Sequence, residues 1–348
     1  MGTSTHIAPI QKSSHLQKSK HTQNTCPIQA NAKPAPVHQA RKEQVQRPSI
    51  ITAIAKPFVK WAGGKSQLLN EVQKVLPQDL ASRKNITYVE PFVGGGAVLF
   101  WILQTYPNIK RAIINDINQE LISTYLAIQN DVENLILELL KFQQEYISLA
   151  PTERSLYFLE KRQAFNKKDV APTRLAALFI FLNRTCFNGL YRVNAKGYFN
   201  VPHGKYANPK IADENNLRAC SRLLQKVEIL CGDFEQTSRY ASRNSIFYLD
   251  PPYKPLSTTS AFTSYTRQGF DDTEQIRLGT FCQKIARKGA LFIESNSDPK
   301  NINPEDTFFD SLYETFSIQR VSANRMINSN TAKRGAISEL LISNVENV

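Results

Sequence analysis

The sequence predicts an α/β fold, in which a mainly parallel sheet is interrupted by a mainly helical insertion. Between residues 86 and 116 a strand, a glycine loop, a helix, a second strand and an acidic residue follow one another. This order is typical of a nucleotide-binding βαβ unit. Helical periodicity then dominates residues 119–182, and strand-like runs resume only after residue 226. We therefore expect one sheet domain whose sequence is split by a second, helical domain.

Order is predicted to begin near Lys56, after a disordered basic tail over residues 1–55. The tail is rich in Gln, Ser, Thr, Lys, Asn and Pro and shows no apolar period. Its five Lys, two Arg and one Glu supply a charge of +6 out of the net +13 of the chain. The tail either adds non-specific attraction to a polyanion or has no part in binding. Its serine-rich, acid-poor composition is also typical of transit peptides, but it holds few arginines.

The sheet domain is predicted over residues 56–118 and 227–348. Its strands are short apolar runs that end at glycine, proline or acidic residues, and its helices repeat with a period near 3.6. A long polar loop is predicted over residues 255–272. The predicted strands span 86–90, 111–115, 227–230, 245–249 and 290–294, the helices span 66–75, 97–104 and 273–286, and a late hairpin spans 314–344.

The helical domain is predicted over residues 119–226. One of its helices has an apolar face, and a second, apolar helix spans 174–182. The composition then changes over residues 183–204, which are dense in Asn, Gly, Arg and aromatic residues. These residues are predicted to form a loop and a β-hairpin that turns at 195–197, before a final helix over 215–224. The apolar face consists of Leu135, Leu139, Phe142 and Tyr146.

Composition restricts the class of protein. The chain has 348 residues, 41% of them hydrophobic, and no apolar run of 18 residues, so we expect no membrane span. The amino terminus lacks the apolar core of a signal peptide. The cysteines are odd in number and scattered, which favours a reducing compartment without disulfides or structural zinc. They are Cys26, Cys186, Cys220, Cys231 and Cys282.

The scarcity of histidines argues against a metal site, and the positive charge suggests an acidic partner. His203 is the only histidine after residue 40, so neither a multi-histidine metal site nor a histidine triad is expected. The body of the chain is basic even without its tail. A basic body suggests nucleic acid as the partner, although many proteins are basic for no specific reason.

Residues 94–96 are three glycines that follow a strand and open a helix, a context that lets a ligand approach the backbone closely. The full Gly-x-Gly-x-x-Gly pattern is absent, because Leu99 stands in place of the third glycine. Asp116 lies at the end of the next strand, where a carboxylate can accept both hydroxyls of a ribose. The alternative is that Asp116 or Asn118 caps the next helix.

Asp250, Pro251, Pro252 and Tyr253 follow a buried strand and place a carboxylate beside an aromatic ring. Each proline holds its own backbone φ at about −65° and lacks an N–H donor, so nearby carbonyls can accept hydrogen bonds. Such a site suits a planar ring that carries an amino group; the alternative is a plain proline turn. Together with the adenosine-type site, it points to methyl transfer from S-adenosylmethionine. No Pro-Cys pair occurs, so cytosine C5 chemistry lacks an obvious nucleophile.

Five motifs in this order resemble the Dam-type family (D12 class, alpha group) of site-specific DNA N6-adenine methyltransferases. The resemblance covers residues 58–344. It implies a Rossmann-like, S-adenosylmethionine-dependent methyltransferase sheet with a target-recognition domain inserted before the fourth motif. The motifs are Lys-Trp-Ala-Gly-Gly-Lys (60–65), Glu-Pro-Phe-Val-Gly-Gly-Gly (90–96), Asn-Asp-Ile-Asn (115–118), Asp-Pro-Pro-Tyr (250–253) and Leu-Phe-Ile-Glu-Ser-Asn (291–296).

The resemblance also implies which residues hold the cofactor and which act on the base. A target adenine, flipped out of the duplex, would stack on Tyr253 while Asp250 and the carbonyl of Pro251 accept hydrogen bonds from its N6. Positioning and electrostatics would then supply most of the catalysis. The residues implied to bind the cofactor are Trp61, Lys65, Glu90, Phe92, Gly94, Gly96, Asp116, Asp233, Phe234 and Asp250.

Residues 188–194 and 197–206 are similar to the hairpin with which family members read GATC in double-stranded DNA. Arg192 matches an arginine aimed at guanine, and arginine forks onto guanine O6 and N7 in the major groove. A phosphate contact or a solvated charge is the alternative for Arg192. His203 stands where a Phe is expected. The residues implied to contact DNA are Lys60, Asn188, Leu190, Arg192, Asn194, Pro202 and Tyr206.

These observations predict a monomeric, cytoplasmic and nucleoid-associated enzyme that methylates adenine N6 in double-stranded DNA, most simply within GATC. A restriction enzyme accompanies it or does not; the sequence leaves both open. The second enzyme class is N4-cytosine or RNA amine methylation, because an Asp-Pro-Pro-Tyr site accepts other planar amines. The non-enzyme alternative is a DNA-binding regulator on an inactive scaffold, which the intact Trp61, Lys65, Asp116 and Asp250 disfavour.

Overall fold

A computed structural model describes residues 53–253, 270–324 and 336–345 of the chain. All of them belong to the unit formed by residues 51–348. The basic tail predicted over 1–55 therefore lies almost wholly outside the described residues, and so does most of the polar loop predicted over 255–272.

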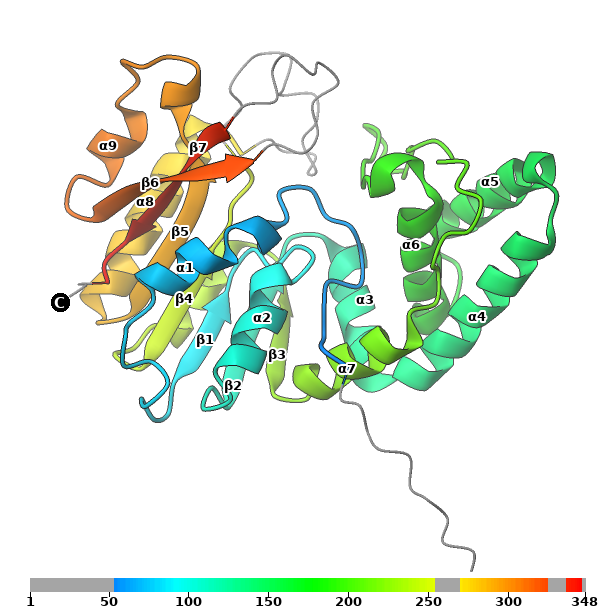
Figure 1. The fold of residues 1–348 in the computed structure, drawn as a ribbon, viewed down its shortest axis with the longest axis horizontal. Helices are drawn as coiled ribbons and strands as arrows, with labels where there is room; N and C mark the ends of the chain where they lie inside the picture. Colours follow the sequence, from blue (N-terminus) through cyan, green and yellow to red (C-terminus); the bar gives the residue numbers. More distant parts are fainter. Residues whose placement is uncertain (1–52, 254–269, 325–335, 346–348) are drawn as a thin grey trace, which may run out of the picture. The chain divides into compact units, whose positions relative to one another are not determined.

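A seven-stranded sheet forms the centre of this unit (Figure 1). Its strands lie in the order β3-β2-β1-β4-β5-β7-β6. Strands β1 to β5 are parallel, whereas β7 runs antiparallel to both of its neighbours. This arrangement confirms the predicted α/β fold. The strands are β1 (Thr87–Glu90), β2 (Arg111–Asp116), β3 (Val227–Cys231), β4 (Ser245–Leu249), β5 (Leu291–Ser297), β6 (Ser317–Asn324) and β7 (Ala336–Ser343).

Helices cover both faces of the sheet, so successive side chains of a strand enter two different apolar layers. In β1, Tyr88 joins the layer with α1, α2, α3 and α7, and Val89 joins the opposite layer with α8 and α9. Strand β4 is buried at every position, which explains its continuous apolar sequence. The helices of the two layers are α1 (Leu69–Val75), α2 (Ala97–Thr105), α3 (Gln119–Asn130), α7 (Glu214–Leu224), α8 (Asp272–Arg287) and α9 (Phe308–Leu312).

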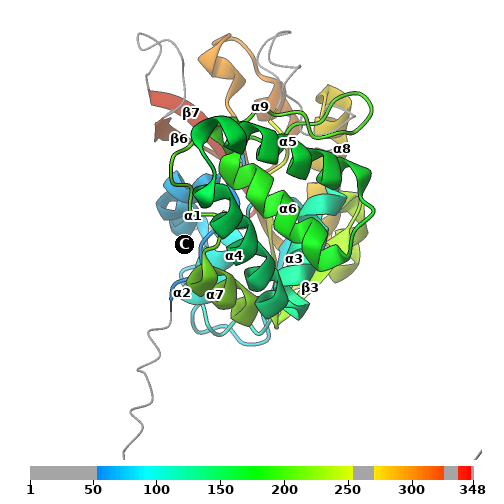
Figure 2. The same ribbon diagram turned by 90° about the vertical axis from the view of Figure 1, so that its right-hand side faces the viewer.

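Three further helices of the segment predicted as a helical insertion lie beside the sheet, whereas α3 and α7 of the same segment pack against it (Figures 1 and 2). The three are α4 (Val132–Ser148), α5 (Pro151–Lys167) and α6 (Pro172–Thr185). Helix α6 packs against α3, α4 and α5 and is buried along most of its length. The apolar face predicted for α4 is buried at all four of its positions. Prolines begin α5 and α6, where a missing N–H costs no helical hydrogen bond.

Several boundaries differ from the prediction. The helix predicted over 66–75 is divided into a 3-10 turn (Lys65–Gln67) and α1. The strand predicted over 290–294 continues to Ser297, because β7 pairs with its carboxyl-terminal half. The hairpin after α6 forms isolated bridges rather than strands, one from Val193 to Phe199 and one from Cys186 to His203. The Asn166 amide binds both backbone groups of Phe199 on its outer side. Helix α9 and the 3-10 helix η3 (Phe234–Tyr240) are too short to be predicted from periodicity.

Three further observations concern the described ranges only. No helix there is long and apolar enough to cross a membrane. No group of three His, Cys, Asp or Glu side chains in those ranges could hold a metal ion. The four cysteines that the structure describes are free thiols, and three of them are buried.

Candidate active site and DNA-binding surface

Three carboxyl side chains lie at the carboxyl ends of neighbouring strands. Glu90 ends β1, Asp116 ends β2 and Asp250 follows β4. Ligands of open parallel sheets bind at this edge. Burial raises the pKa of all three carboxyls, and repulsion from Asp250 and Asp116 raises the pKa of Glu90 further. The edge of the sheet therefore favours a positively charged group.

Asp116 is bound to the glycine loop rather than to the next helix. Its Oδ2 accepts a hydrogen bond from the Gly94 N–H at 3.0 Å, and its Oδ1 accepts one from the Asn118 N–H at 2.9 Å. The cap of α3 is Asn118, whose Oδ1 accepts a hydrogen bond from the Leu121 N–H at 2.9 Å. The capping alternative thus belongs to Asn118, and Asp116 remains a candidate ligand of a ribose.

The glycine loop is shaped by close contacts with aromatic side chains. Gly94 and Gly96 have φ of 48° and 76°, values that side chains rarely tolerate. A Cβ at Gly94 would lie 2.8 Å from Cδ1 of Trp61, and one at Gly96 would lie 2.5 Å from the hydroxyl of Tyr125. Trp61 also stacks on Tyr191 with ring centroids 5.5 Å apart. Glycine at these positions therefore keeps the loop open beside Trp61.

Asp250 is paired with Lys65. The Lys65 ammonium lies 2.7 Å from Oδ1 of Asp250 and 4.4 Å from the ring centroid of Tyr253. Ser295 donates a hydrogen bond to the same Oδ1 at 3.1 Å. Burial raises the pKa of Asp250, although Lys65 and Ser295 oppose the rise. A cation thus occupies the position between the carboxylate and the aromatic face.

Two side chains from other elements hold the segment after Asp250. Gln275 of α8 donates a hydrogen bond to the carbonyl of Pro252 at 3.3 Å. The Tyr253 hydroxyl donates to Oε2 of Glu339 on β7 at 2.6 Å. Both contacts lie at the end of the Asp-Pro-Pro-Tyr motif, so α8 and β7 contribute to its conformation.

Gln275 belongs to a buried polar network between α8 and β5. Asn296 donates a hydrogen bond to Oε1 of Gln275 at 3.1 Å and one to Oε1 of Glu294 at 3.2 Å. The Tyr313 hydroxyl donates to Oε2 of Glu294 at 2.5 Å. Burial raises the pKa of Glu294 to about 7, although the hydrogen bonds from Tyr313 and Asn296 oppose the rise. The network explains why the fifth sequence motif contains polar residues inside a strand.

Asp233 and Phe234, which follow β3, lie against α8. Asp233 caps η3 by accepting a hydrogen bond from the Glu235 N–H at 2.9 Å, and it forms an ion pair with Arg277 at 2.6 Å. These contacts lower the pKa of Asp233 despite the opposing effect of burial. The Arg277 guanidinium also lies 4.4 Å from the ring centroid of Phe234, which packs on Phe92 at 5.2 Å. The structure therefore brings Phe92 and Phe234 together.

A buried asparagine on α6 connects the first sequence motif to the hairpin. Asn183 accepts a hydrogen bond from the Lys60 N–H at 2.8 Å and donates to the carbonyls of Lys60 and Gly189, both at 2.9 Å. The Lys60 ammonium lies 5.7 Å from the ring centroid of Tyr206, whose hydroxyl accepts a hydrogen bond from the Asn188 N–H at 3.1 Å. Asn183 thus holds Lys60 directly and also Gly189, the residue between Asn188 and Leu190, so one side chain supports both segments.

The remaining predicted DNA contacts lie along the hairpin. Arg192 is exposed, and its Nε donates a hydrogen bond to Oδ1 of Asn200 at 2.8 Å. Leu190 and Pro202 are also exposed. The Oδ1 of Asn194 accepts hydrogen bonds within the turn, from the N–H groups of residues 196 and 198 at 3.0 Å each. Asn194 therefore shapes the hairpin, whereas Arg192 presents an oriented guanidinium to solvent.

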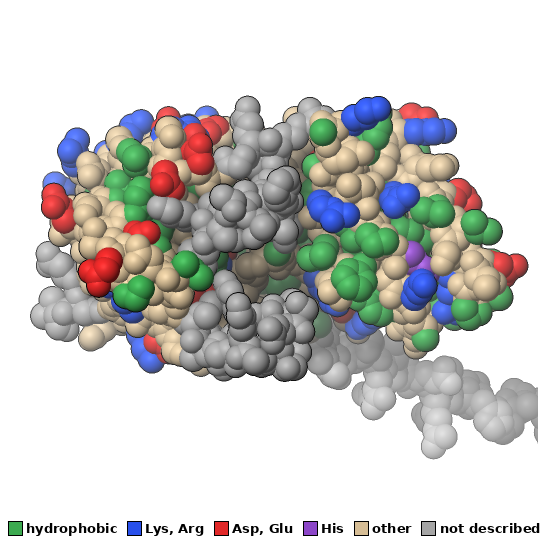
Figure 3. Space-filling model, turned by 90° about the horizontal axis from the view of Figure 1, so that it is seen from above, with side chains coloured by type: hydrophobic (Ala, Val, Ile, Leu, Met, Phe, Trp, Pro, Cys, Tyr) green, Lys and Arg blue, Asp and Glu red, His purple; other side chains and the backbone are tan. Residues whose placement is uncertain are grey.

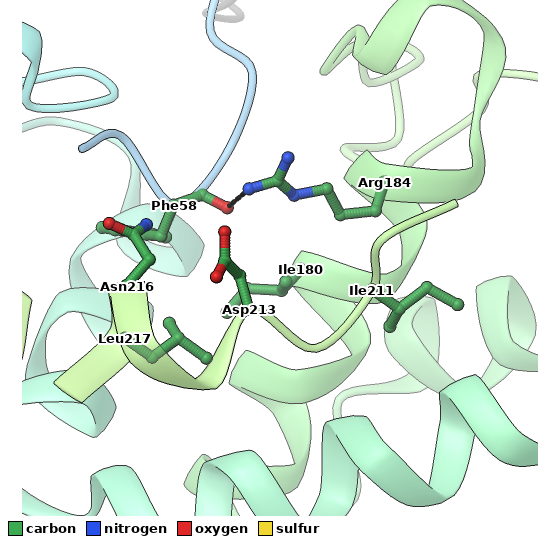
Figure 4. A pocket seen from close by; sticks show the side chains of 7 residues that line it. All are labelled: Phe58, Ile180, Arg184, Ile211, Asp213, Asn216 and Leu217. Atoms are coloured by element: carbon green, nitrogen blue, oxygen red, sulfur yellow. Dashed lines mark hydrogen bonds between the residues drawn. The ribbon is translucent and has the colours of Figure 1, made fainter. Parts of the chain in front are cut away.

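Seen from above, Lys and Arg side chains are spread over the part formed by the helical insertion (Figure 3). A small hollow lies where α6 and α7 meet the chain that precedes Lys60 (Figure 4). Across it Arg184 donates a hydrogen bond to the carbonyl of Phe58 at 2.8 Å. None of the predicted site residues lines it, so we assign it to packing. Its lining is Phe58, Ile180, Arg184, Ile211, Asp213, Asn216 and Leu217.

Four residues near the site are missing from the sequence prediction. Gln275 and Glu339 contact the Asp-Pro-Pro-Tyr motif from segments distant in sequence, and no local pattern marks them. Ser295 also contacts the motif, and it lies within the fifth sequence motif, for which no site role was predicted. Ile117 follows Asp116 and is 55% exposed, although it is a large apolar side chain. An apolar residue directly after the ribose acid is a signal that could have been read from the sequence.

The sheet order, with a glycine loop after β1 and an acid at the end of β2, defines a Rossmann-like methyltransferase. The chain belongs to the family described as D12 class N6 adenine-specific DNA methyltransferase, whose family model matches residues 61–327. It is therefore an adenine-specific DNA methyltransferase that uses S-adenosylmethionine. This confirms the predicted family and enzyme class, and it favours adenine N6 in DNA over the alternatives of cytosine N4 and RNA amines.

Individual relatives support the assignment over most of the chain. The type II methyltransferase M.MjaIII of Methanocaldococcus jannaschii is 50% identical over 292 residues, which cover 83% of this chain and 99% of the relative. The type II methyltransferase M1.LlaDCHI of Lactococcus lactis is 36% identical over 84% of this chain and 96% of its own. A DNA adenine methylase of Vibrio cholerae is 36% identical over 82% of this chain and 95% of its own.

Proposed function

We propose that the protein methylates N6 of an adenine flipped out of duplex DNA, with Asp250, Pro251 and Tyr253 as the transfer site. The position of the Lys65 ammonium carries this proposal. It places an N–H donor 2.7 Å from Asp250 and above the ring of Tyr253. The amino group of an adenine stacked on Tyr253 would present the same kind of donor to the same carboxylate. Lys65 then has to move aside when the base enters.

The residues at the sheet edge fit S-adenosylmethionine. Gly94 and Gly96 let the loop backbone lie against Trp61 and Tyr125, where a Cβ would collide, and Asp116 has the position of a ribose acceptor. Phe92 and Ile117 offer apolar surface for an adenine ring, and the buried Phe234 packs on Phe92. Trp61, Lys65, Glu90, Asp233 and Asp250 complete the proposed set. When bound, the cofactor supplies a methyl group on a positively charged sulfonium, which the three carboxyls of this edge favour.

The proposed chemistry needs no covalent enzyme intermediate. Asp250 and the Pro251 carbonyl accept the two N6 hydrogens, which localises the nitrogen lone pair that is otherwise shared with the ring. The bound cofactor would supply its methyl group to N6 with loss of the carbon–sulfur bond, and Asp250 would accept the surplus proton of N6. Burial raises the pKa of Asp250, which suits a proton acceptor. Positioning and electrostatics supply the remaining catalysis.

Recognition of GATC is proposed for the hairpin that carries Arg192. Asn200 holds one side of the exposed guanidinium, which reduces the entropy lost when the fork binds guanine. Lys60, Asn188, Leu190, Pro202 and Tyr206 are proposed as further contacts, and Asn194 as a residue that also shapes the turn. Two relatives are named type II methyltransferases, which supports a place in a restriction–modification system.

We propose a division of labour that follows the sequence. Residues 56–118 and 227–348 form the catalytic domain, residues 119–226 form the recognition domain, and the tail over 1–55 adds basic charge. A single copy of the chain contains every proposed site residue, which supports a monomer. Action on chromosomal DNA supports a cytoplasmic, nucleoid-associated location.

The proposal is tested with plasmid DNA that the purified enzyme has methylated. We expect resistance to a nuclease that cuts only unmethylated GATC, and cleavage by a nuclease that cuts only the methylated form. Asp250→Ala should lower transfer by at least about a thousandfold while DNA retention stays largely intact. Transfer to oligonucleotides altered at each base of the site would identify a different target if GATC is wrong. Near wild-type turnover by Asp250→Ala would contradict the proposed transfer site.

A further inference from the structure

The hydroxyl of Tyr253 has no part in stacking, because stacking uses the face of the ring. The structure nevertheless gives this hydroxyl a specific partner. It donates to Oε2 of Glu339 at 2.6 Å, a distance typical of a hydrogen bond to a carboxylate. Such bonds are about twice as strong as those between neutral groups.

Glu339 has a fixed position within the sheet. It lies on β7, between Ser297 of β5 and Val321 of β6 in the antiparallel register. A residue held by strands on both sides is a rigid support for a side chain outside the sheet. Tyr253, by contrast, lies in the segment after β4, where the sheet no longer holds the backbone.

We propose that Glu339 is a positioning residue of the transfer site, which holds the plane of the Tyr253 ring in the orientation that a flipped base requires. The inference rests on the proposed stacking role of Tyr253. Without Glu339 the ring can rotate about its side-chain torsions, and the base it carries no longer faces the methyl group in line. Small misalignments of this kind lower the rate of transfer more than they lower binding.

A double-mutant cycle tests whether Glu339 acts through the Tyr253 hydroxyl. Glu339→Ala and Tyr253→Phe should each lower the single-turnover rate by about tenfold. The double variant should be no slower than either single variant, because both changes remove the same hydrogen bond. Losses that multiply in the double variant would overturn the inference, and so would a wild-type rate for Glu339→Ala.

A conservative variant separates positioning from charge. Glu339→Gln keeps an oxygen that can accept the hydroxyl proton but removes the negative charge. We expect its rate to lie within about threefold of wild type. A loss as large as that of Glu339→Ala would show that the charge matters rather than the hydrogen bond, which would overturn the inference. Glu314→Ala, at an exposed glutamate after α9, is the matched control and should transfer at the wild-type rate.

Two further measurements keep the outcome interpretable. The melting temperature and the affinity for S-adenosylmethionine should stay unchanged in Glu339→Ala, since a folding defect would alter both. The fluorescence of 2-aminopurine at the target position should change in Glu339→Ala, because it reports how the flipped base stacks. Tyr253→Ala tests the stacking role itself. If it transfers at the wild-type rate, the proposed function of Tyr253 fails independently of Glu339.

Discussion

At the scale of single residues, the structure shows which of two neighbouring side chains caps α3 and which is left to bind a ribose. Asp116 and Asn118 lie two positions apart, and either could cap α3. The structure gives the cap to Asn118, and it directs Asp116 to the Gly94 N–H. An asparagine can cap without placing a charge, so the carboxylate remains at the sheet edge where a ribose would bind.

Gly94→Ala should weaken cofactor binding by at least about tenfold. The added Cβ would lie 2.8 Å from Trp61, and a φ of 48° strains alanine. Isothermal titration with S-adenosylmethionine measures the effect. Gly64→Ala is the control, because its Cβ would meet no atom closer than 3.4 Å and its φ is −53°. Equal affinities for the two variants would contradict the proposed role of the loop.

The residues that could be predicted from sequence are those that mark strand ends. Asp250 follows an apolar run directly, Asp116 lies one residue beyond such a run, and the loop before Gly96 is rich in glycine, so local patterns are sufficient. Glu339 lies 86 positions from its partner Tyr253. The sequence predicts the late hairpin but not its register, and a shift of one residue would turn Glu339 to the other face. Contacts of this kind depend on tertiary packing and leave no local signal.

At the scale of elements, two asparagine side chains hold the segment that leads into Trp61. Asn183 of α6 pairs with both backbone groups of Lys60, at 2.8 and 2.9 Å. Asn216 of α7 pairs with both backbone groups of Lys56, at 2.8 and 3.0 Å. The segment is thus bound as a strand would be, but by side-chain amides of two helices. Only Asn183 also binds the hairpin, through Gly189.

Asn183→Ala and Asn216→Ala form a matched pair. Each removes buried hydrogen bonds to the same segment, so each should lower the free energy of unfolding by about 2–3 kcal/mol. Only Asn183→Ala should also weaken binding to a GATC duplex, by about tenfold, because only Asn183 supports the hairpin. Urea denaturation and fluorescence anisotropy measure the two effects. Equal DNA affinities would show that the hairpin does not depend on Asn183.

At the scale of the whole molecule, the stability of the fold depends on acids enclosed by the sheet and its helices. Glu294 lies on β5 and is buried in the core, where the Tyr313 hydroxyl donates a hydrogen bond to it, and its pKa is about 7. An unfolded chain would return this pKa to about 4.3. The folded state therefore binds a proton that the unfolded state has lost between these two values, and stability falls as the pH rises through this window.

Replacing this acid should change how stability depends on pH. In the wild type, the contribution of Glu294 is fully present below about pH 4 and declines until about pH 7, by about 3 kcal/mol in total. Glu294→Gln removes the titration, so the difference in unfolding free energy between variant and wild type should shift in favour of the variant from pH 5 to pH 8. Urea denaturation at both values measures it. A difference that does not change with pH would show that Glu294 titrates normally.

Trp61 lies between the glycine loop and the hairpin, since it contacts Gly94 on one side and stacks on Tyr191 on the other. The chain has two tryptophans, and Trp101 lies on α2 against Tyr106. The indole at position 61 is consequently an intrinsic optical probe placed where cofactor and DNA recognition meet. With Trp101→Phe as the background, the emission of one natural chromophore would record the arrival of either ligand and the order in which they bind.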